Sequence, residues 1–331
     1  MLLDWKTIIT ESSMNIVFLA FNFGISSRFV NGPGMSLWNL VKAIKAFDPE
    51  CEVDVFTTMP STTQEDGVGT HLISDTRKLK AKINNANLVH HWSGLRPEFT
   101  KALSIANGAK KTVFIGPNVV DCVDMRGEKR LLSQVKFDRL LAVNDRLKFI
   151  ISVKHNVRLQ NMDTLVVGPD LELWSPPKDR SSFILWKGNS GHGVKDIDFG
   201  LKVADKLDKY EFRFIGHPRA YNYFSHIREA KRAKVYYCTS LSETKGMALA
   251  EQWSAGVPSV THPKIYLHGK NYETGIITNR DVDSYCEAIE EIMENDDLYN
   301  HLSLGASNFA KEEFDPMKLA SDYAGIVNDV G

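Results

Sequence analysis

The segment Thr239–Val260 reads TSLSETKGMALAEQWSAGVPSV, and the rest of the chain is best interpreted around it. Two carboxylates, Glu243 and Glu251, stand eight positions apart in this segment. The pattern predicts a buried strand that ends near Ser240, a polar loop, and a helix over residues 246–255. The helix should therefore begin at the carboxyl end of a strand, with one carboxylate in the loop and the other inside the helix.

A helix that begins at this place offers a binding site for a phosphate or diphosphate. Gly246 stands at its start and Gly256 at its end. The first backbone N–H groups of a helix have no partner within it, and with the helix dipole they attract an anion. In this chain those groups belong to Met247, Ala248 and Leu249. Glu251 can then accept paired hydrogen bonds from a ribose diol, and Glu243 can bind sugar hydroxyls. The alternative is a solvated helix that carries two incidental glutamates.

With Gly246, Gly256 and Pro258 in place, the segment resembles the E-x7-E signature of retaining GT-B glycosyltransferases, especially family 4. The usual form of that signature is E-G-F-G-L-P-x-x-E-A-M-A-x-G-x-P-V. This chain departs from it in the aromatic-Gly-Leu-Pro portion, which is replaced by Lys245, Met247 and Ala248. The resemblance extends over most of residues 14–328. It implies an α/β protein of the GT-B class, with two Rossmann-like domains and an active-site cleft between them.

Size and composition agree with two domains in a soluble protein. The 331 residues suffice for two cores, and 43% hydrophobic with 24% charged residues is ordinary. No apolar run reaches the roughly 18 residues that span a bilayer, and residues 1–13 look like an extension without the pattern of a signal peptide. The four scattered cysteines predict reduced thiols and no structural metal. We therefore expect a cytoplasmic protein, in the host cytoplasm if it is phage-encoded.

The small net charge of −1 hides an asymmetry. Residues 1–170 carry 21 Lys+Arg and 17 Asp+Glu, and the remainder carries 19 and 24, so the halves have charges of +4 and −5. The excess lies between Arg126 and Arg158, where nine basic residues face three acids. Such a run is either a solvated surface or a surface for an anionic acceptor such as a nucleic acid. Three aromatic residues, Trp92, Phe137 and Phe149, stand near it.

The first half alternates strands with helices. Residues 14–22 are an apolar, β-branched run typical of a buried strand, and MSLWNLVKAIKAF (35–47) has the spacing of an amphipathic helix. Further strands are predicted at Val53–Thr57, His71–Ser74, Leu88–His91, Thr112–Ile115 and Leu140–Val143. The alternation indicates a parallel, doubly wound sheet. The loop before the first helix contains Gly32 and Gly34, and the resemblance implies that it faces the donor diphosphate.

Candidate sugar or acceptor ligands follow two of these strands. The sequence Asn87–His91 resembles the family's D-V-V-H-x-H strand, which places His90 and His91 at the carboxyl edge of the sheet. Each of these histidines is as consistent with a structural role as with a functional one. The next strand departs from the family, because Gly116 stands where members have a histidine that contacts the donor sugar. His90, His91 or Asn118 can take over that contact.

The hinge between the domains is expected near 169–179. Residues 164–177 resemble the linker consensus V-I-P-N-G-V-D-x-x-x-F-x-P, and the prolines support a boundary independently. The predicted organisation is an extension at 1–13, an acceptor domain at 14–170, a donor domain at 180–314, and a C-terminal helix at 315–331 that crosses back to the first domain. Only eighteen residues separate the strands predicted at Glu211–Gly216 and Val235–Thr239, so the donor domain lacks a βα unit that many members have.

The donor domain opens with a candidate pair of cations. Family members read G-R-x-x-x-x-K-G where this chain has Lys187 through Lys195, and their Arg and Lys neutralise the donor diphosphate. Registered on the trailing Gly-Val, Lys187 falls on the Arg position and His192 on the Lys position, with Lys195 close by. Lysine keeps the charge of arginine but loses its bidentate fork. The alternative is a turn with solvated lysines.

The resemblance implies a retaining, metal-independent transfer of a sugar from a nucleotide sugar, with a UDP-sugar as the expected donor and no cofactor. Lys187, Lys195 or His192 and the N–H groups at the helix start would stabilise the leaving diphosphate, with Glu251 on the ribose and Glu243 on the sugar. The favoured acceptor is DNA with hydroxymethylated bases, as in phage-type enzymes. The alternatives are lipopolysaccharide or another glycan, a non-catalytic sugar- or nucleotide-binding module, and an epimerase or phosphorylase.

Overall fold

A computed structural model describes most of the chain. It covers residues 14–21, 23–24, 32–61, 65–92, 101–103, 110–115, 137–156, 158–189, 191, 193–218, 223–243, 246–265 and 269–329. The described residues divide into an N-terminal unit, up to Ile115, from 137 to Leu165 and from Leu319 onward, and a C-terminal unit between Val166 and Lys318. The predicted boundaries stood at 170 and 314 instead, and the predicted extension at 1–13 lies outside the described residues.

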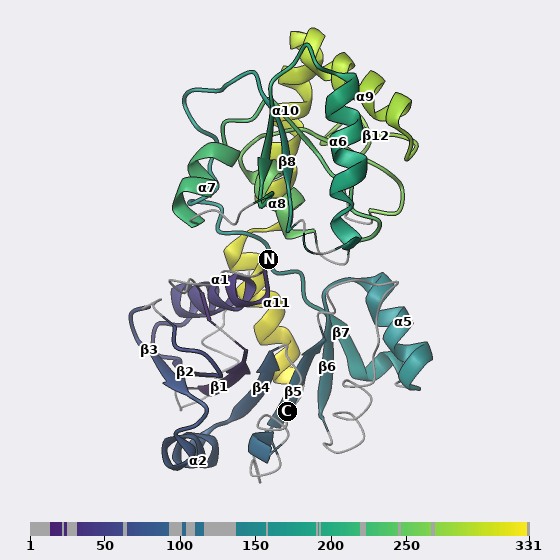
Figure 1. Cartoon of the computed structure of the whole chain (residues 1–331). Coiled ribbons are helices and arrows are strands. Elements are labelled where there is room, and N and C mark those ends of the chain that lie inside the picture. The colour runs from purple at the N-terminus through teal and green to yellow at the C-terminus, as the bar shows by residue number, and fades with distance from the viewer. Residues whose placement is uncertain are drawn as a thin grey trace, which may run out of the picture. The chain divides into compact units, whose positions relative to one another are not determined.

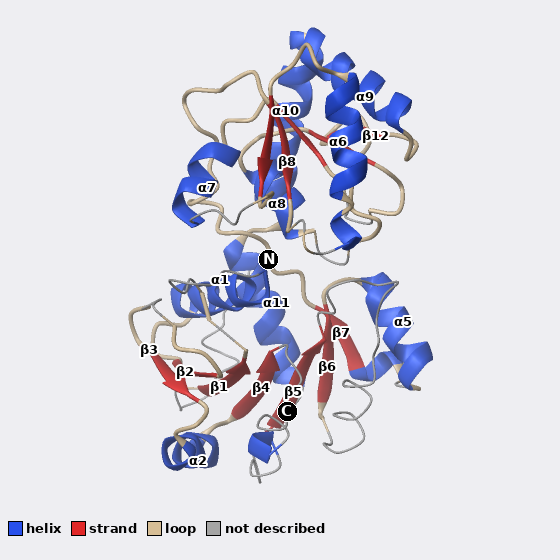
Figure 2. Cartoon of the chain, in the orientation of Figure 1, coloured by secondary structure: helices blue, strands red, loops and turns tan. Residues whose placement is uncertain are grey.

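The N-terminal unit is built on a seven-stranded parallel sheet of order β3-β2-β1-β4-β5-β6-β7 (Figures 1 and 2). The strands are β1 (Asn15–Ala20), β2 (Glu52–Thr57), β3 (Val68–Leu72), β4 (Leu88–Trp92), β5 (Lys110–Ile115), β6 (Arg139–Ala142) and β7 (Met162–Thr164). The helices are α1 (Gly32–Phe47), α2 (Thr76–Asn85), α5 (Asp145–His155) and most of α11 (Pro316–Asp329). The order 3-2-1-4-5-6 is that of dinucleotide-binding folds, so the direction of winding reverses between β1 and β4.

The helix α1 begins earlier than its apolar spacing predicts. It starts at Gly32, so Gly32 and Gly34 belong to its first turn and not to a loop before it. Proline is well tolerated in a first turn because its missing N–H would have no partner there, and Pro33 occupies that turn. The carbonyl oxygen of Gly34 accepts a hydrogen bond from the backbone N–H of Gly24 at 3.0 Å. The turn is therefore fixed against the segment that follows β1.

The C-terminal unit contains a five-stranded parallel sheet of order β12-β11-β10-β8-β9. Its strands are β8 (Ile184–Lys187), β9 (Phe212–Ile215), β10 (Val235–Tyr237), β11 (Ser259–Thr261) and β12 (Gly275–Ile277). Its helices are α6 (Ile197–Lys206), α7 (Tyr223–Ala230), α8 (Met247–Ser254), α9 (Val282–Glu294) and α10 (Asp296–Glu313). In the described residues between β9 and β10 the only regular element is α7, which confirms the predicted loss of one βα unit.

The shorter connection changes the strand order of this unit. Numbered within the unit, the order is 2-1-3-4-5, the second common arrangement of doubly wound sheets. Its winding reverses between β8 and β10. Ligands of such sheets bind beyond the carboxyl ends of the strands at that reversal. Those two strand ends carry Lys187 and the start of the E-x7-E segment, so the fold places the predicted donor residues where its topology favours a ligand.

Helices pack on this sheet in pairs, α6 with α9 and α8 with α10. Between α9 and the sheet lie large buried aromatic residues whose polar atoms are bonded. The hydroxyl of Tyr237 donates to the carbonyl of Gly200 at 3.0 Å, and that of Tyr285 donates to the carbonyl of Cys238 at 2.8 Å. The second bond reaches the residue that directly follows β10. The core therefore also fixes the carboxyl end of this central strand.

One glycine sits where the two strand ends β8 and β9 come close together. Gly216 follows β9 with φ of +87°, and a Cβ at this position would overlap the carbonyl oxygen of Gly188. We expect Gly216→Ala to lower the free energy of unfolding by at least about 2 kcal/mol, because both the backbone angle and the contact exclude a side chain. Urea denaturation followed by tryptophan fluorescence measures this change.

The matched control is Gly325→Ala on α11, where a Cβ would meet nothing within 4 Å. Alanine has the higher helix propensity, so we expect this variant to gain up to about 1 kcal/mol. Equal denaturation midpoints for Gly216→Ala and the unsubstituted protein would contradict the close approach of β8 and β9.

Candidate donor site

The candidate site lies at the carboxyl ends of β8 and β10 in the C-terminal unit. Lys187 is the last residue of β8, Glu243 lies in the loop after β10, and Glu251 lies inside α8. Gly246 precedes α8 with φ of +54° and has no side chain to cap it. The first N–H groups of α8, on Met247, Ala248 and Leu249, have no partner within the helix. The strand, loop and helix predicted from the sequence are thus present in that order.

The predicted cations and carboxylates meet as two ion pairs. Lys187 Nζ pairs with Glu251 Oε2, and both side chains are 9% exposed. Lys195 Nζ pairs with Glu243 Oε1, and this lysine is 26% exposed. The Ser240 hydroxyl also donates to Glu243 Oε1, at 2.7 Å. The structure therefore brings four of the predicted site residues together, whereas His192 lies outside the described residues.

The balance between burial and the partner's charge differs between the two ion pairs. Burial lowers the pKa of Lys187, with Lys195 adding to the effect and Glu251 opposing it. Burial likewise raises the pKa of Glu251 against the attraction of Lys187. Burial also acts to lower the pKa of Lys195, but the nearby Glu243 outweighs it, so that pKa rises. The neighbouring carboxylate therefore outweighs burial at Lys195, whereas burial outweighs the carboxylate at Lys187.

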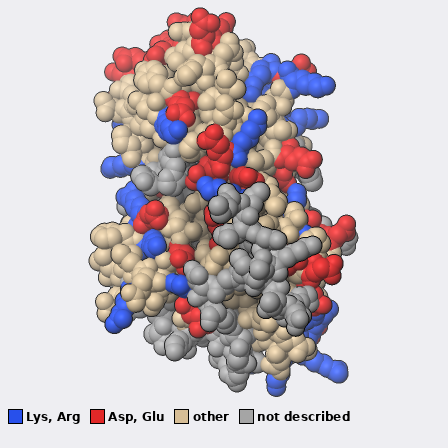
Figure 3. Space-filling model, turned by 180° about the vertical axis from the view of Figure 1, so that it is seen from behind, with Lys and Arg blue, Asp and Glu red and all other residues tan. Residues whose placement is uncertain are grey.

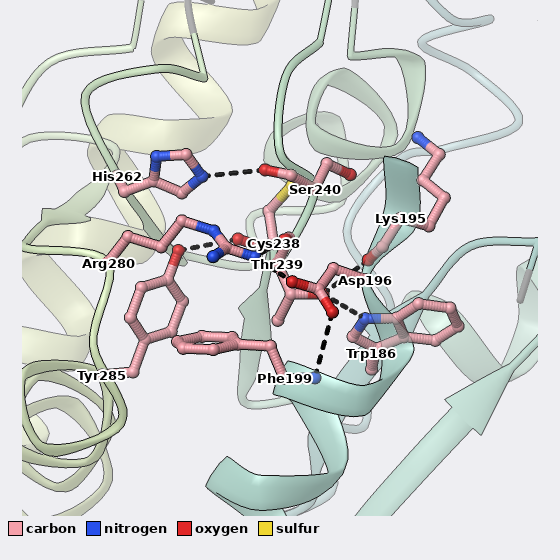
Figure 4. Close-up of polar contacts among 10 residues, drawn as sticks. All are labelled: Trp186, Lys195, Asp196, Phe199, Cys238, Thr239, Ser240, His262, Arg280 and Tyr285. Atoms are coloured by element: carbon pink, nitrogen blue, oxygen red, sulfur yellow. Dashed lines mark hydrogen bonds and ion pairs between the residues drawn. The ribbon is translucent and has the colours of Figure 1, made fainter. Parts of the chain in front are cut away.

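The segment that carries Lys195 is tied to the end of β10 (Figure 4). Thr239 accepts a hydrogen bond from Trp186 Nε1 at 2.7 Å and donates one to the carbonyl of Lys195 at 2.8 Å. Arg280 pairs with Asp196 and donates to the carbonyl of Thr239 at 3.2 Å. In Figure 4 the ammonium of Lys195 points away from this network. These contacts fix the 3-10 turn η3 (Gly193–Lys195) through its backbone, so the ammonium of Lys195 remains paired with Glu243.

Asp196 has a second contact that the sequence could have indicated. Its side chain accepts from the backbone N–H of Phe199 at 3.3 Å and caps α6. An aspartate before an apolar helical pattern is an ordinary N-cap signal. The pairing of Asp196 with Arg280 carries no such signal, because the two residues are 84 positions apart. Both residues are therefore additions to the predicted site.

His262 supports the loop between β10 and α8. Its ring is 1% exposed, and burial lowers its pKa. Nδ1 accepts from the backbone N–H of Lys264 at 3.3 Å, so Nε2 carries the proton and donates to the carbonyl of Ser240 at 2.8 Å. Glu243 itself forms an isolated parallel bridge with Ile265. The segment 262–265 thus braces the loop that carries Glu243, a support that the sequence did not reveal.

The histidines predicted to bind sugar lie in the core of the N-terminal unit. His90 is fully buried between Phe18 and Trp92, with ring centroids at 5.2 and 5.4 Å, and its Nδ1 lies 3.4 Å from the hydroxyl of Tyr323 on α11. Burial lowers the pKa of His90 to about 3, so the ring is neutral. His91 is 2% exposed. The structure gives His90 a packing role, and a sugar contact by either histidine stays a prediction.

Other predicted features of the N-terminal unit are corrected or not described. Trp92 is fully buried, so it cannot serve as an exposed aromatic beside the basic stretch. Phe149 is 61% exposed and does lie on the surface. Gly116, Asn118 and most of the basic stretch before 137 lie outside the described residues.

The described residues offer neither a cluster of metal ligands nor a membrane-spanning helix. Among them, no group of three or more His, Cys, Asp and Glu side chains is placed to hold a metal ion. No helix in the same part of the chain is both long and apolar enough to cross a bilayer.

Comparison of the sequence with protein-family models and with curated proteins finds no match. Solved structures do match. HepE from Anabaena, in complex with UDP and glucose, is 12% identical with a TM-score of 0.74, over 96% of this chain and 100% of that chain. Sucrose-phosphate synthase from Thermosynechococcus elongatus is 12% identical with a TM-score of 0.75, over 96% and 99%. WaaG, a glycosyltransferase involved in lipopolysaccharide biosynthesis, is 13% identical with a TM-score of 0.64, over 94% and 99%.

These likenesses extend over nearly the whole length of this chain and of each neighbour. At such low identity they show the fold. The chain has the GT-B fold, as its sequence predicts.

Proposed function

We propose that the protein is a glycosyltransferase that moves a sugar from a nucleotide sugar, with UDP as the expected nucleotide, to an acceptor hydroxyl. The observation that carries this proposal is the pairing of Lys187 and Lys195 with Glu251 and Glu243 at the winding reversal of a GT-B donor-type sheet. The complexes of HepE with UDP and with UDP-glucose support the choice of nucleotide.

The ion pairs define what donor binding must do. In the structure the two lysines pair with the two glutamates. A diphosphate at the start of α8 would take over both cations, and the N–H groups of Met247–Leu249 would add hydrogen bonds to it. Glu251 would then be released to the ribose diol and Glu243 to the donor sugar. The carboxylates thus hold the cations in place until the donor replaces them.

The reaction breaks the bond from the anomeric carbon to the diphosphate oxygen and forms a bond from the same carbon to the acceptor oxygen. The acceptor proton passes to a phosphate oxygen, and the anomeric configuration is retained. Negative charge grows on the departing diphosphate, so cations fixed beforehand favour the transition state. Lys187 and Lys195 supply that charge in a metal-independent mechanism.

The favoured acceptor is DNA with hydroxymethylated bases. The basic side chains of Arg146 and Lys148 on α5 favour a polyanionic acceptor. A base in a DNA duplex would have to be extruded from the helix to react. In the described part of the face in Figure 3, Lys and Arg of the N-terminal unit lie among Asp and Glu and form no continuous basic surface. A glycan acceptor is the second candidate, favoured by the likeness to WaaG.

The test is donor turnover by the whole protein. We expect nucleotide release from one member of a nucleotide-sugar panel that depends on hydroxymethylcytosine or hydroxymethyluracil DNA, with a sugar mass added to the digested nucleoside. The DNA KM should also rise steeply with salt. Nucleotide release that does not depend on DNA would support the glycosyltransferase activity and indicate a glycan acceptor. Nucleotide binding without release from any donor would refute the proposal in favour of a non-catalytic binding module.

A further inference from the structure

Trp174 is held rigidly beside the donor site. It ends a turn in which its backbone N–H donates to the carbonyl of Asp170 at 2.9 Å. The side chain of Asp170 in turn accepts from the N–H of Leu173 at 3.0 Å, and Lys231 Nζ donates to the carbonyl of Leu173 at 3.0 Å. The indole itself is 1% exposed. The ring therefore has little freedom to move within the C-terminal unit.

The ammonium of Lys187 lies over this ring. Its Nζ is 4.5 Å from the ring centroid of Trp174, within the range of a cation–π interaction. The ring of His226 on α7 stands edge-on to the indole, with centroids 6.0 Å apart. Lys187 is thus placed between a fixed aromatic face and the carboxylate of Glu251. Its ammonium therefore contacts groups from two separate parts of the unit, the turn that ends at Trp174 and the helix α8.

The groups around Lys187 stabilise its charged form less once the donor has bound. The titratable groups that act on it are Glu251 on α8, Lys195 on η3 and His226 on α7. Burial and the charge of Lys187 lower the pKa of His226 to about 2, so this ring is neutral. When Glu251 turns to a ribose, Lys187 loses the carboxylate that opposes its desolvation. The indole face attracts the cation without occupying any of its N–H groups, which stay available for phosphate.

We propose that Trp174 is a positioning residue for Lys187: its indole face keeps the ammonium charged and in place at the end of β8 while the donor diphosphate replaces Glu251. This inference rests on the proposed function. It also gives a reason for an aromatic residue at a linker position far from the E-x7-E segment in sequence. The first turn of the C-terminal unit would then contribute directly to nucleotide affinity.

The first experiment measures Lys187 itself. The protein is labelled with [ε-13C]lysine, and the Lys187 signal is assigned by its loss in Lys187→Met. We expect the titration of this signal to shift to lower pH in Trp174→Leu, because the charged form loses its aromatic partner. In a second series, tryptophan analogues with an increasing number of fluorine atoms are placed at position 174. Fluorine withdraws electrons from the ring and keeps its shape, so the titration of the Lys187 signal should move to lower pH in steps. An unchanged or raised pKa across the fluorinated series would overturn the inference, even if Trp174→Leu folds poorly.

The second experiment links the ring to ligand binding. We expect calorimetry to show that Trp174→Leu binds UDP about 10- to 30-fold more weakly. The affinity for UDP should fall as the pH rises, and in this variant the fall should begin at a lower pH than in the unsubstituted protein. In a Lys187→Met background the same substitution should have little further effect, because its partner is gone. An equal loss in both backgrounds would mean a merely structural role. Failure of the unsubstituted protein to bind UDP or any other nucleotide would refute the proposed function and this role together.

Discussion

Glu251→Ala is expected to raise the KM for the nucleotide sugar by about 100-fold or more, with a much smaller change in kcat. The carboxylate would hold the ribose in the ground state and the transition state alike, so its loss is a loss of uniform binding. Two hydrogen bonds from a diol to a charged group contribute about 3 kcal/mol or more together. Steady-state kinetics with the donor identified by turnover measures both constants.

Because Glu251 pairs with Lys187, the same variant should also change its affinity for pyrophosphate, in the opposite direction to its affinity for UDP. Without Glu251, no carboxylate competes with phosphate for Lys187, so at a pH low enough to keep this lysine charged we expect inorganic pyrophosphate to bind more tightly even as UDP binds more weakly. Removing one partner of a buried pair also destabilises a protein by about 3–5 kcal/mol, which makes a parallel folding assay necessary. The matched control is Glu290→Ala, which breaks a surface pair with Lys209 and should leave the kinetics unchanged. Unaltered donor KM in Glu251→Ala would sink the ribose assignment.

The sequence predicts the regular elements of the C-terminal unit well because their signals are local. The helix predicted over residues 246–255 is α8, Met247–Ser254, because a glycine before its short apolar run and another after it mark the two ends. The short connection between β9 and β10 could be read from its length alone. The five-stranded order of the sheet is one of the two common orders of doubly wound folds.

Errors occur where the local signal is weak or has two meanings. The strand β3 spans Val68–Leu72 and not His71–Ser74, because it is an edge strand, only partly buried, without a clear apolar pattern. The strand β7, of only three residues, is not predicted; it ends at Thr164, where the resemblance to the linker consensus begins. Gly32 and Gly34 suggest a loop, yet with a proline between them they also suit the first turn of a helix.

The sequence proposes the site residues, but it does not indicate which of them lie against each other. Lys187 and Glu251 are 64 positions apart, and Lys195 and Glu243 are 48 apart. The resemblance assigned the lysines to a phosphate and the glutamates to sugars, which describes the site with a donor bound. In the folded protein these buried charges of opposite sign pair with each other. Under the proposed function, the donor would therefore exchange one set of partners for another.

Glu243→Ala is expected to lower kcat by about 100-fold or more while the donor KM changes little, because the glutamate would act where positive charge develops on the sugar. An interaction made mainly in the transition state affects kcat and kcat/KM alike. Lys195 is partly exposed, so the loss of its partner leaves a cation that water can solvate, and the fold should tolerate the change. Single-turnover measurements at saturating donor isolate the chemical step.

The substitution Glu243→Gln separates two ways in which the carboxylate could act. Glutamine keeps an oxygen that can accept from the Ser240 hydroxyl, now 2.7 Å from the carboxylate, but it carries no charge. If Glu243 stabilises an oxocarbenium-like sugar by its charge, the glutamine variant should be as slow as the alanine variant. If it only hydrogen-bonds a sugar hydroxyl, glutamine should restore most of the rate. A normal kcat with a raised KM in both variants would instead assign Glu243 to donor binding. The transition state would then be stabilised only through the diphosphate, by Lys187, Lys195 and the N–H groups at the start of α8.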